Sequence, residues 1–193
     1  MVIGWPRSGT HWLRSILSQA LGYDIQHLHK VPLRIREMCG LFIVRDPRDA
    51  FLSHYHLYNR THLPRTQMQH FEQFFCGKGM GQPNFRLGWG NYVGLMLGLV
   101  AESPNVVLVR FEDMKLRTVS CLQAALGKIY MFPSRHRLVR AVIAYGRTRC
   151  DPSNMPVCDE LGKAGEWKIE LEADVCEALV SYCGDVMSEL RYD

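Results

Sequence analysis

The stretch GWPRSGTHWLRSIL, residues 4–17, decides the fold class of the chain. The residues around its start, VIG at 2–4, are typical of the end of a buried strand, and apolar residues recur on one face of a helix over 10–21. A short turn containing Arg7 and Gly9 lies between the two. A strand, a glycine-containing turn and a helix in this order direct backbone N–H groups and the positive end of the helix dipole at an anion. The stretch therefore predicts a site for a phosphate or sulfate group where the turn meets the helix.

Two further apolar runs and a series of helical patterns follow along the chain. The runs over 40–46 and 105–113 are continuous, which predicts strands buried on both faces, and a short strand is expected within 24–29. Helical patterns lie near 48–58, 66–76, 89–101, 117–128, 134–147 and 172–190. Buried strands that alternate with helices predict an α/β fold with a central, mostly parallel sheet flanked by helices. No repeat or linker divides the sequence, so we expect one domain over residues 1–193.

The composition excludes several classes of protein. The longest apolar run, at 94–101, falls well short of the roughly 20 residues of a membrane span, so we expect no such span. A formal charge of +4 is too small to predict a nucleic-acid partner. Seven cysteines without a Cys-x-x-Cys pair predict neither a disulfide framework nor a zinc site, and reduced thiols indicate the cytoplasm. The sequence does not predict the oligomeric state.

A second motif, LFIVRDPRDAFLSHYH at 41–56, also points to an anion. Arg45 comes at the carboxyl end of an expected buried strand, which is where open α/β sheets bind their ligands. Ser53 follows eight residues later on a helix for which Asp46 is the expected N-cap, so both side chains can converge on one group. The alternative is that Arg45 pairs with Asp46 or Asp49 and that Ser53 is a small packing residue.

Taken together, four segments resemble the sulfotransferase family, whose sulfuryl donor is 3′-phosphoadenosine 5′-phosphosulfate (PAPS). WPRSGTHW at 5–12 is similar to the family's 5′-phosphosulfate loop, and FIVRDPRDAFLSHYH at 42–56 is similar to its 3′-phosphate motif. VVLVRFEDMK at 106–115 resembles the strand that ends in Tyr-Glu-Asp-Met-Lys, and GKAGEWK at 162–168 resembles part of the C-terminal loop. The four segments occur in the family's order.

The resemblance implies a donor site that releases 3′-phosphoadenosine 5′-phosphate (PAP) as product. The implied donor-binding residues are Arg7, Ser8, Gly9, Thr10, His11 and Trp12 of the first loop, Arg45 and Ser53 at the 3′-phosphate, Phe111 at the adenine, and Gly162 and Lys163 of the C-terminal loop. Arg7 replaces the commoner lysine and would contact the 5′-phosphate and the bridging oxygen. The family's Arg-Lys-Gly has only its glycine here, because Glu160 and Leu161 stand at the two cationic positions.

The resemblance also implies a histidine that acts as general base on the hydroxyl or amine of an acceptor. The matching segment is DIQHLHKVP at 24–32, which offers His27 and His29. We favour His29 because it lies closer to Pro32, as in the family's pattern, and we keep His27 as the alternative base. No metal ion is expected, and we interpret His54 and His56 as residues of a helix surface.

Two other functions remain open on the sequence. Gly4 and Gly9 have the spacing of a nucleotide-triphosphate loop, but Thr10 occupies the place of its lysine, so a small-molecule kinase would need a degenerate loop. A non-catalytic adenine-nucleotide-binding protein is the other alternative, favoured if the departure at Glu160 and Leu161 marks a decayed site. The retained residues of the implied site argue against such decay, namely His29, Arg7, Arg45 and Ser53. The acceptor cannot be identified, although Trp89 and Tyr92 are candidates to line its site.

Overall fold

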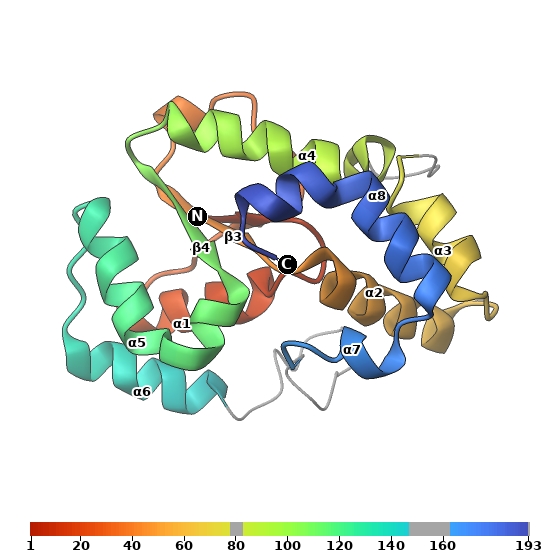
Figure 1. Cartoon of the computed structure of the whole chain (residues 1–193). Coiled ribbons are helices and arrows are strands. Elements are labelled where there is room, and N and C mark those ends of the chain that lie inside the picture. Colours follow the sequence, from red (N-terminus) through yellow and green to blue (C-terminus); the bar gives the residue numbers. More distant parts are fainter. Residues whose placement is uncertain (78–82, 147–162, 193) are drawn as a thin grey trace.

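A parallel sheet of four strands is the centre of the computed structural model, which describes residues 1–77, 83–146 and 163–192 (Figure 1). The strands are β1 (Val2–Gly4), β2 (His27–Leu28), β3 (Gly40–Val44) and β4 (Val106–Arg110), in the spatial order β2-β1-β3-β4. All three neighbouring pairs run parallel. The α/β fold with a parallel sheet that the sequence predicts is confirmed.

Helices cover both faces of this sheet. They are α1 (Thr10–Leu21), α2 (Pro47–Thr61), α3 (Gln67–Phe74), α4 (Pro83–Ala101), α5 (Phe111–Lys128), α6 (Arg135–Gly146), α7 (Trp167–Glu170) and α8 (Ala173–Glu189), together with the short 3₁₀ turn η1 (Ile35–Glu37). Helices α1, α5 and α6 share one hydrophobic cluster with the sheet, and α2, α3, α4 and α8 share the other (Figure 1).

The alternation of side chains along the strands separates these two clusters. In β3, Phe42 and Val44 belong to the cluster beneath α2 and α4, whereas Leu41 and Ile43 belong to the cluster beneath α1 and α5. All five residues of β3 are buried, as expected of a strand covered on both faces. This burial fixes the carboxyl end of β3, and hence Arg45, inside the molecule.

Two glycines allow the first turn to approach its neighbours closely. A Cβ atom on Gly4 would lie 2.6 Å from the carbonyl oxygen of Ile43, so a side chain there would separate β1 from β3. Gly9 has a φ of 92°, and a Cβ on it would lie 2.8 Å from the ring of Phe111. Close packing therefore requires glycine at both positions, and the left-handed backbone conformation also favours it at Gly9.

One expected strand and one expected residue role differ from the structure. The strand expected over 105–113 ends at Arg110, and residues 111–113 form the first turn of α5. The acidic side chains of Glu112 and Asp113 interact favourably there with the positive end of the helix dipole. Trp89 and Tyr92 are fully buried in the cluster beneath α4, so they pack in the core instead of lining an open acceptor site.

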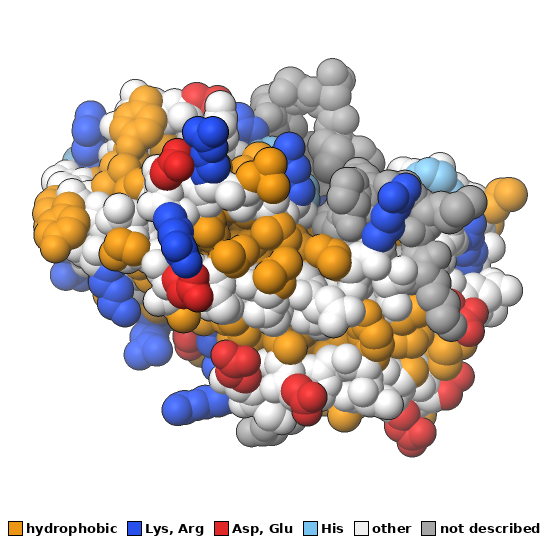
Figure 2. All heavy atoms as spheres, turned by 90° about the horizontal axis from the view of Figure 1, so that it is seen from above, with side chains coloured by type: hydrophobic (Ala, Val, Ile, Leu, Met, Phe, Trp, Pro, Cys, Tyr) orange, Lys and Arg blue, Asp and Glu red, His pale blue; other side chains and the backbone are white. Residues whose placement is uncertain are grey.

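The outer face of α4 and α8 carries hydrophobic side chains among charged ones (Figure 2). Leu95 on α4 is 48% exposed and Val180 on α8 is 44% exposed. Exposed aliphatic side chains of this kind are common on protein surfaces, so they do not define a partner. Within the described ranges, no helix is both long enough and apolar enough to cross a membrane.

His54 is not the surface residue that we expected, since its ring is half-buried and contacts a second histidine. The Nδ1 atom of His54 lies 2.7 Å from Nε2 of the fully buried His70. His70 also packs edge-on against Phe51 and close to Phe74. Burial lowers the pKa of His70 to about 3 and that of His54 to about 4, so both rings are neutral at pH 7. His56, by contrast, is exposed and pairs with Glu170, as a surface residue does.

The buried His70 predicts a loss of stability in mild acid. Its folded-state pKa lies below that of the unfolded chain, so the unfolded state binds more protons, and stability falls as pH decreases from about 6.5 toward the folded value. Between pH 7 and pH 5 this one proton lowers the free energy of unfolding by about 2 kcal/mol. In urea unfolding, the free energy of unfolding should therefore decrease less from pH 7 to pH 5 for His70→Gln than for the wild type. Equal decreases in the two proteins would refute this role of His70.

Candidate functional site

Arg45 is a buried cation at the carboxyl end of β3. Its side chain is 2% exposed, and its Nη1 and Nη2 groups donate hydrogen bonds to the carbonyl oxygens of Arg7 (3.1 Å) and Lys163 (3.0 Å). Nε has no hydrogen-bond partner among the described residues. Burial lowers the pKa of Arg45, and the nearby charges of Asp49 and Glu112 oppose this effect. The hydrogen bonds of Arg45 thus go to main-chain oxygens, and a buried donor group remains for a ligand.

Arg7 connects the first loop to the second motif. Its Nε donates a hydrogen bond to the hydroxyl oxygen of Ser53 at 3.0 Å, while its carbonyl oxygen accepts from Arg45. Arg7 has a φ of 69°, a left-handed conformation that is uncommon for residues other than glycine. The structure therefore brings together Arg7, Arg45 and Ser53, which the sequence places on two separate segments.

The start of α1 supplies further hydrogen-bond donors. Gly9 is the N-cap of this helix and, as a glycine, offers no side chain to cap its first N–H groups. The hydroxyl of Ser8 is fully buried and has no hydrogen-bond partner within the described part of the chain, and Thr10 is 2% exposed. An unpaired buried hydroxyl is costly, so a ligand that bonds to it would relieve that cost. The loop is thus suited to an anion, as the sequence predicts.

An aromatic pair adjoins Arg45, and so does Lys115, which the sequence analysis did not single out. The rings of Trp12 and Phe111 meet edge to face with centroids 5.8 Å apart, and the guanidinium carbon of Arg45 lies 4.6 Å from the Phe111 centroid. The Nζ atom of Lys115 lies 5.7 Å and 5.8 Å from these two ring centroids, and desolvation lowers its pKa. Lys115 follows Phe111 by four residues on α5, and this spacing was the signal that could have identified it.

The segment after residue 162 is held against α2. The carboxylate of Asp49 accepts hydrogen bonds from the N–H groups of Gly165 (2.6 Å) and Trp167 (3.1 Å), and the Arg48 guanidinium lies 3.7 Å from the Trp167 ring centroid. These contacts place the Lys163 carbonyl at Arg45, while the Lys163 side chain is exposed. Gly162, Glu160 and Leu161 lie outside the described residues.

A buried polar network supports the first turn of α2. The carboxylate of Asp46 caps this helix and accepts hydrogen bonds from the Arg48 guanidinium at 2.8–3.3 Å. Glu112 accepts from the Asp46 N–H at 3.0 Å and from the Tyr192 hydroxyl at 2.8 Å, and burial raises the pKa of Glu112. Because Asp46 is bonded to Arg48, it does not neutralise Arg45. In the sequence, the charged residues on either side of Pro47, Asp46 and Arg48, could have indicated this network.

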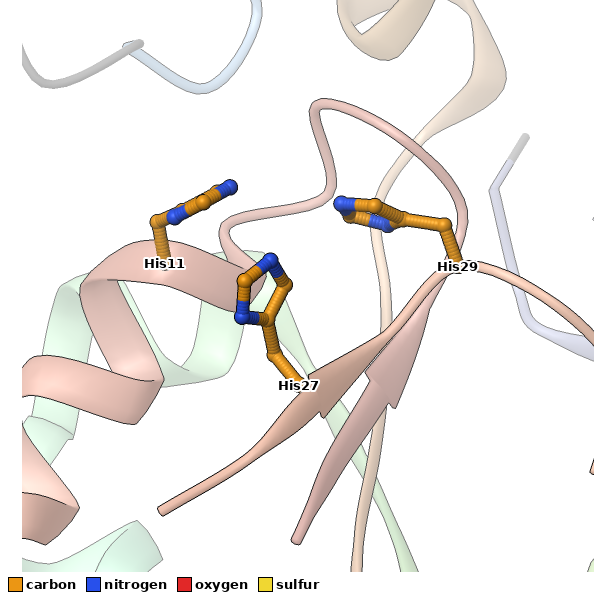
Figure 3. A group of neighbouring side chains, drawn as sticks. All are labelled: His11, His27 and His29. Atoms are coloured by element: carbon orange, nitrogen blue, oxygen red, sulfur yellow. The ribbon is translucent and has the colours of Figure 1, made fainter. Parts of the chain in front are cut away.

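The two candidate bases lie beside the first loop (Figure 3). The Nδ1 atom of His29 lies 2.9 Å from the carbonyl oxygen of Gly4, so Nδ1–H donates and Nε2 keeps its lone pair. Burial lowers the pKa of His29, and the charge of Arg7 lowers it further. Burial also lowers the pKa of His27, to about 4, and its ring lies 4.1 Å from that of His11. Both rings are therefore neutral at pH 7, and the bond to Gly4 fixes the orientation of His29.

The fold and these clustered cations define the chain as an α/β protein with a candidate anion site at the carboxyl end of its sheet. Mouse sulfotransferase SULT7A1, solved in complex with PAP, superposes with a TM-score of 0.75 at 17% sequence identity, covering 96% of this chain and 83% of that one. Retinol dehydratase, solved with androsterone and the inactive cofactor PAP, superposes with a TM-score of 0.73 at 12% identity, covering 96% and 79%.

Part of the sequence also matches a sulfotransferase family model. Residues 40–127 match the family model described as "Sulfotransferase domain". Comparison with curated proteins gave no significant match. The chain therefore has the sulfotransferase fold and contains a sulfotransferase domain match, and the resemblance noted in its motifs is confirmed.

Proposed function

We propose that this protein transfers a sulfuryl group from PAPS to a hydroxyl or amine acceptor. The observation that carries the proposal is the convergence of Arg7 and Arg45, from two separate segments, on the start of α1, whose N-cap is a glycine. Two cations and a set of unpaired donors at one place are suited to a doubly anionic ligand. PAPS, when bound, supplies the activated sulfuryl group, and both solved relatives named above contain PAP.

The residues present fit the two charged ends of this donor. Ser8, whose buried hydroxyl has no hydrogen-bond partner in the part of the chain that the structure describes, would bind the 5′-phosphosulfate together with Arg7 and the first N–H groups of α1. Arg45, whose buried Nε also lacks a partner among the described residues, would bind the 3′-phosphate with Ser53. Trp12 and Phe111 would contact the adenine from the position that they occupy beside Arg45.

His29 would remove the acceptor's proton during the transfer. Its Nδ1–H is bonded to Gly4, and its Nε2 lone pair is the free basic atom on the side of the first loop. Transfer of a sulfuryl group resembles phosphoryl transfer in that catalysis depends on alignment and on stabilising charge on the oxygens. Arg7 would provide this charge, since it lies close enough to His29 to lower its pKa. The chain's own groups thus provide a base and an anion-stabilising cation.

We further propose a cytoplasmic location and a small-molecule acceptor. The five cysteines in the described ranges are free thiols, as expected in a reducing compartment. A steroid, androsterone, is present in the solved retinol dehydratase, so hydroxyl-bearing small molecules are the first acceptors to test.

Thermal unfolding with nucleotides tests the donor site directly. PAP at about 100 times its dissociation constant should stabilise the protein by about 2.7 kcal/mol, which raises the midpoint by about 5–10 °C for a chain of this length. AMP, which lacks the 3′-phosphate, should give a much smaller shift at the same concentration. A shift with magnesium-ATP alone would support a kinase instead, and no shift with any nucleotide would contradict the proposal.

A further inference from the structure

Three histidines from two elements face one another beside the first loop. His11 lies in the first turn of α1, His27 on β2, and His29 just after β2, and Figure 3 shows their rings directed toward a common space. One ring nitrogen from each of the three lies within 4.8 Å of the other two. No other group of three or more histidine, cysteine or acidic residues in the described ranges has this geometry. We propose that His11, His27 and His29 bind a zinc ion.

The chemistry of the donor set favours zinc. Neutral imidazole is a preferred ligand of zinc, with Zn–N distances of about 2.0–2.1 Å, and three histidines with an open fourth position form a known type of zinc site. Such bonds place the three nitrogens about 3.3 Å apart in a tetrahedral site, so the rings need to approach one another by about 1.5 Å or less. Rotation of the His11 and His27 side chains can supply this movement while His29 keeps its bond to Gly4, because both histidines are partly exposed.

The surroundings of the cluster support a metal ion in two ways. The Gly4 carbonyl accepts the Nδ1–H of His29, and bonds of this kind orient a ligating histidine and leave Nε2 for the metal. His27 and His29 are two residues apart on an extended segment, so their side chains lie on the same face, opposite His11. Two cations lie near the cluster: Arg14, whose charge is balanced by Asp24 at 3.0 Å, and Arg7, which acts on His29.

Zinc and the acceptor would then compete for the same nitrogen. A zinc ion bound to Nε2 of His29 occupies the lone pair that we assign to the general base, so bound zinc should inhibit sulfuryl transfer and a chelator should restore it. This consequence rests on the proposed function, whereas zinc binding itself does not.

Calorimetric titration of zinc into chelator-treated protein tests the site without an activity assay. We expect one zinc ion per chain for the wild type. The zinc affinity of His11→Gln and of His27→Gln should be at least about 100-fold lower. Removing a residue that only hydrogen-bonds to a metal ligand already lowers metal affinity by about 10- to 100-fold, and removing the ligand itself should cost more. His136→Gln is the matched control, because His136 is an exposed histidine of α6, and it should bind as the wild type does. His29 is left intact to preserve its bond to Gly4.

Cobalt provides a second readout of the ligands. Cobalt(II) in a site of three imidazoles should give visible absorption typical of four-coordinate cobalt, without the near-ultraviolet charge-transfer band of a thiolate ligand. Wild-type affinity in both His11→Gln and His27→Gln, or a thiolate band, would overturn the assignment. The PAP midpoint shift of the wild type and of His27→Gln reports separately on the donor site, because His27 is not among the implied donor-binding residues, so failure of the metal site and failure of the proposed function are distinguishable.

Discussion

Replacing Arg45 with alanine is expected to abolish the stabilisation of the protein by PAP. Arg45 is 2% exposed, and it presents a buried guanidinium at the carboxyl end of β3. Truncating one partner of a buried, hydrogen-bonded charge pair costs about 2–5 kcal/mol. The affinity for PAP should therefore fall by about 30- to 4,000-fold. Thermal unfolding and calorimetric titration with PAP measure this loss.

Two variants separate the loss of a phosphate contact from general damage. Arg45→Lys keeps the charge but loses the planar fork, so its affinity for PAP should lie between those of the wild type and Arg45→Ala. Arg36→Ala removes an exposed arginine that pairs with Glu102, and it should bind PAP as the wild type does. Undiminished PAP binding by Arg45→Ala would exclude Arg45 from the donor site, and Arg7 would then be the remaining arginine to bind the phosphates of PAP.

The sequence predicted the fold well where local chemistry is decisive. Helix α1 begins at Thr10 and ends at Leu21, as its apolar spacing indicates, and Asp46 with Pro47 starts α2 as predicted. The apolar run at 105–113 was less informative, because Phe111 is both a good strand residue and the first residue of α5. Burial on the sheet and burial under a helix select the same side-chain type at this position, so periodicity cannot separate them.

The site was predicted only in part, because tertiary contacts determine the role of each charge. The sequence identified Arg45 and Ser53 but could not show that Ser53 bonds to Arg7 and not to Arg45. It also left open a pairing of Arg45 with Asp49, whose carboxylate instead binds the N–H groups of Gly165 and Trp167, more than 100 residues away. Long-range contacts of this kind leave no local pattern.

Some histidines were misjudged for the same reason. His54 looked like a surface residue on a helix, and its contact with the buried His70 depends on how α3 packs against α2. His11, His27 and His29 were considered only as loop or base residues, and their grouping emerges from the placement of β2 beside β1. The register of this short pair of strands decides which side chains face the first loop.

Replacing His29 with asparagine is expected to reduce sulfuryl transfer by about 100- to 10,000-fold, the usual contribution of a general base. The asparagine amide can still donate to the Gly4 carbonyl at the place of Nδ1–H, but it has no basic atom in place of Nε2. The fold and the donor site should therefore persist, and the PAP midpoint shift should stay at its wild-type value. Transfer of labelled sulfuryl groups to an acceptor of the wild-type protein, measured with a chelator present, gives the rate.

A parallel His27→Asn variant decides between the two candidate bases. The bond to the Gly4 carbonyl fixes the ring orientation of His29, and His27 has no corresponding bond to Gly4. The ring of His27 packs against that of His11 instead. Its substitution should therefore reduce the rate less than His29→Asn does. If His27→Asn causes the larger loss while PAP binding is unchanged, the base is His27. If neither variant loses activity, neither His27 nor His29 is the base, and catalysis would rest on charge stabilisation by Arg7 and the start of α1.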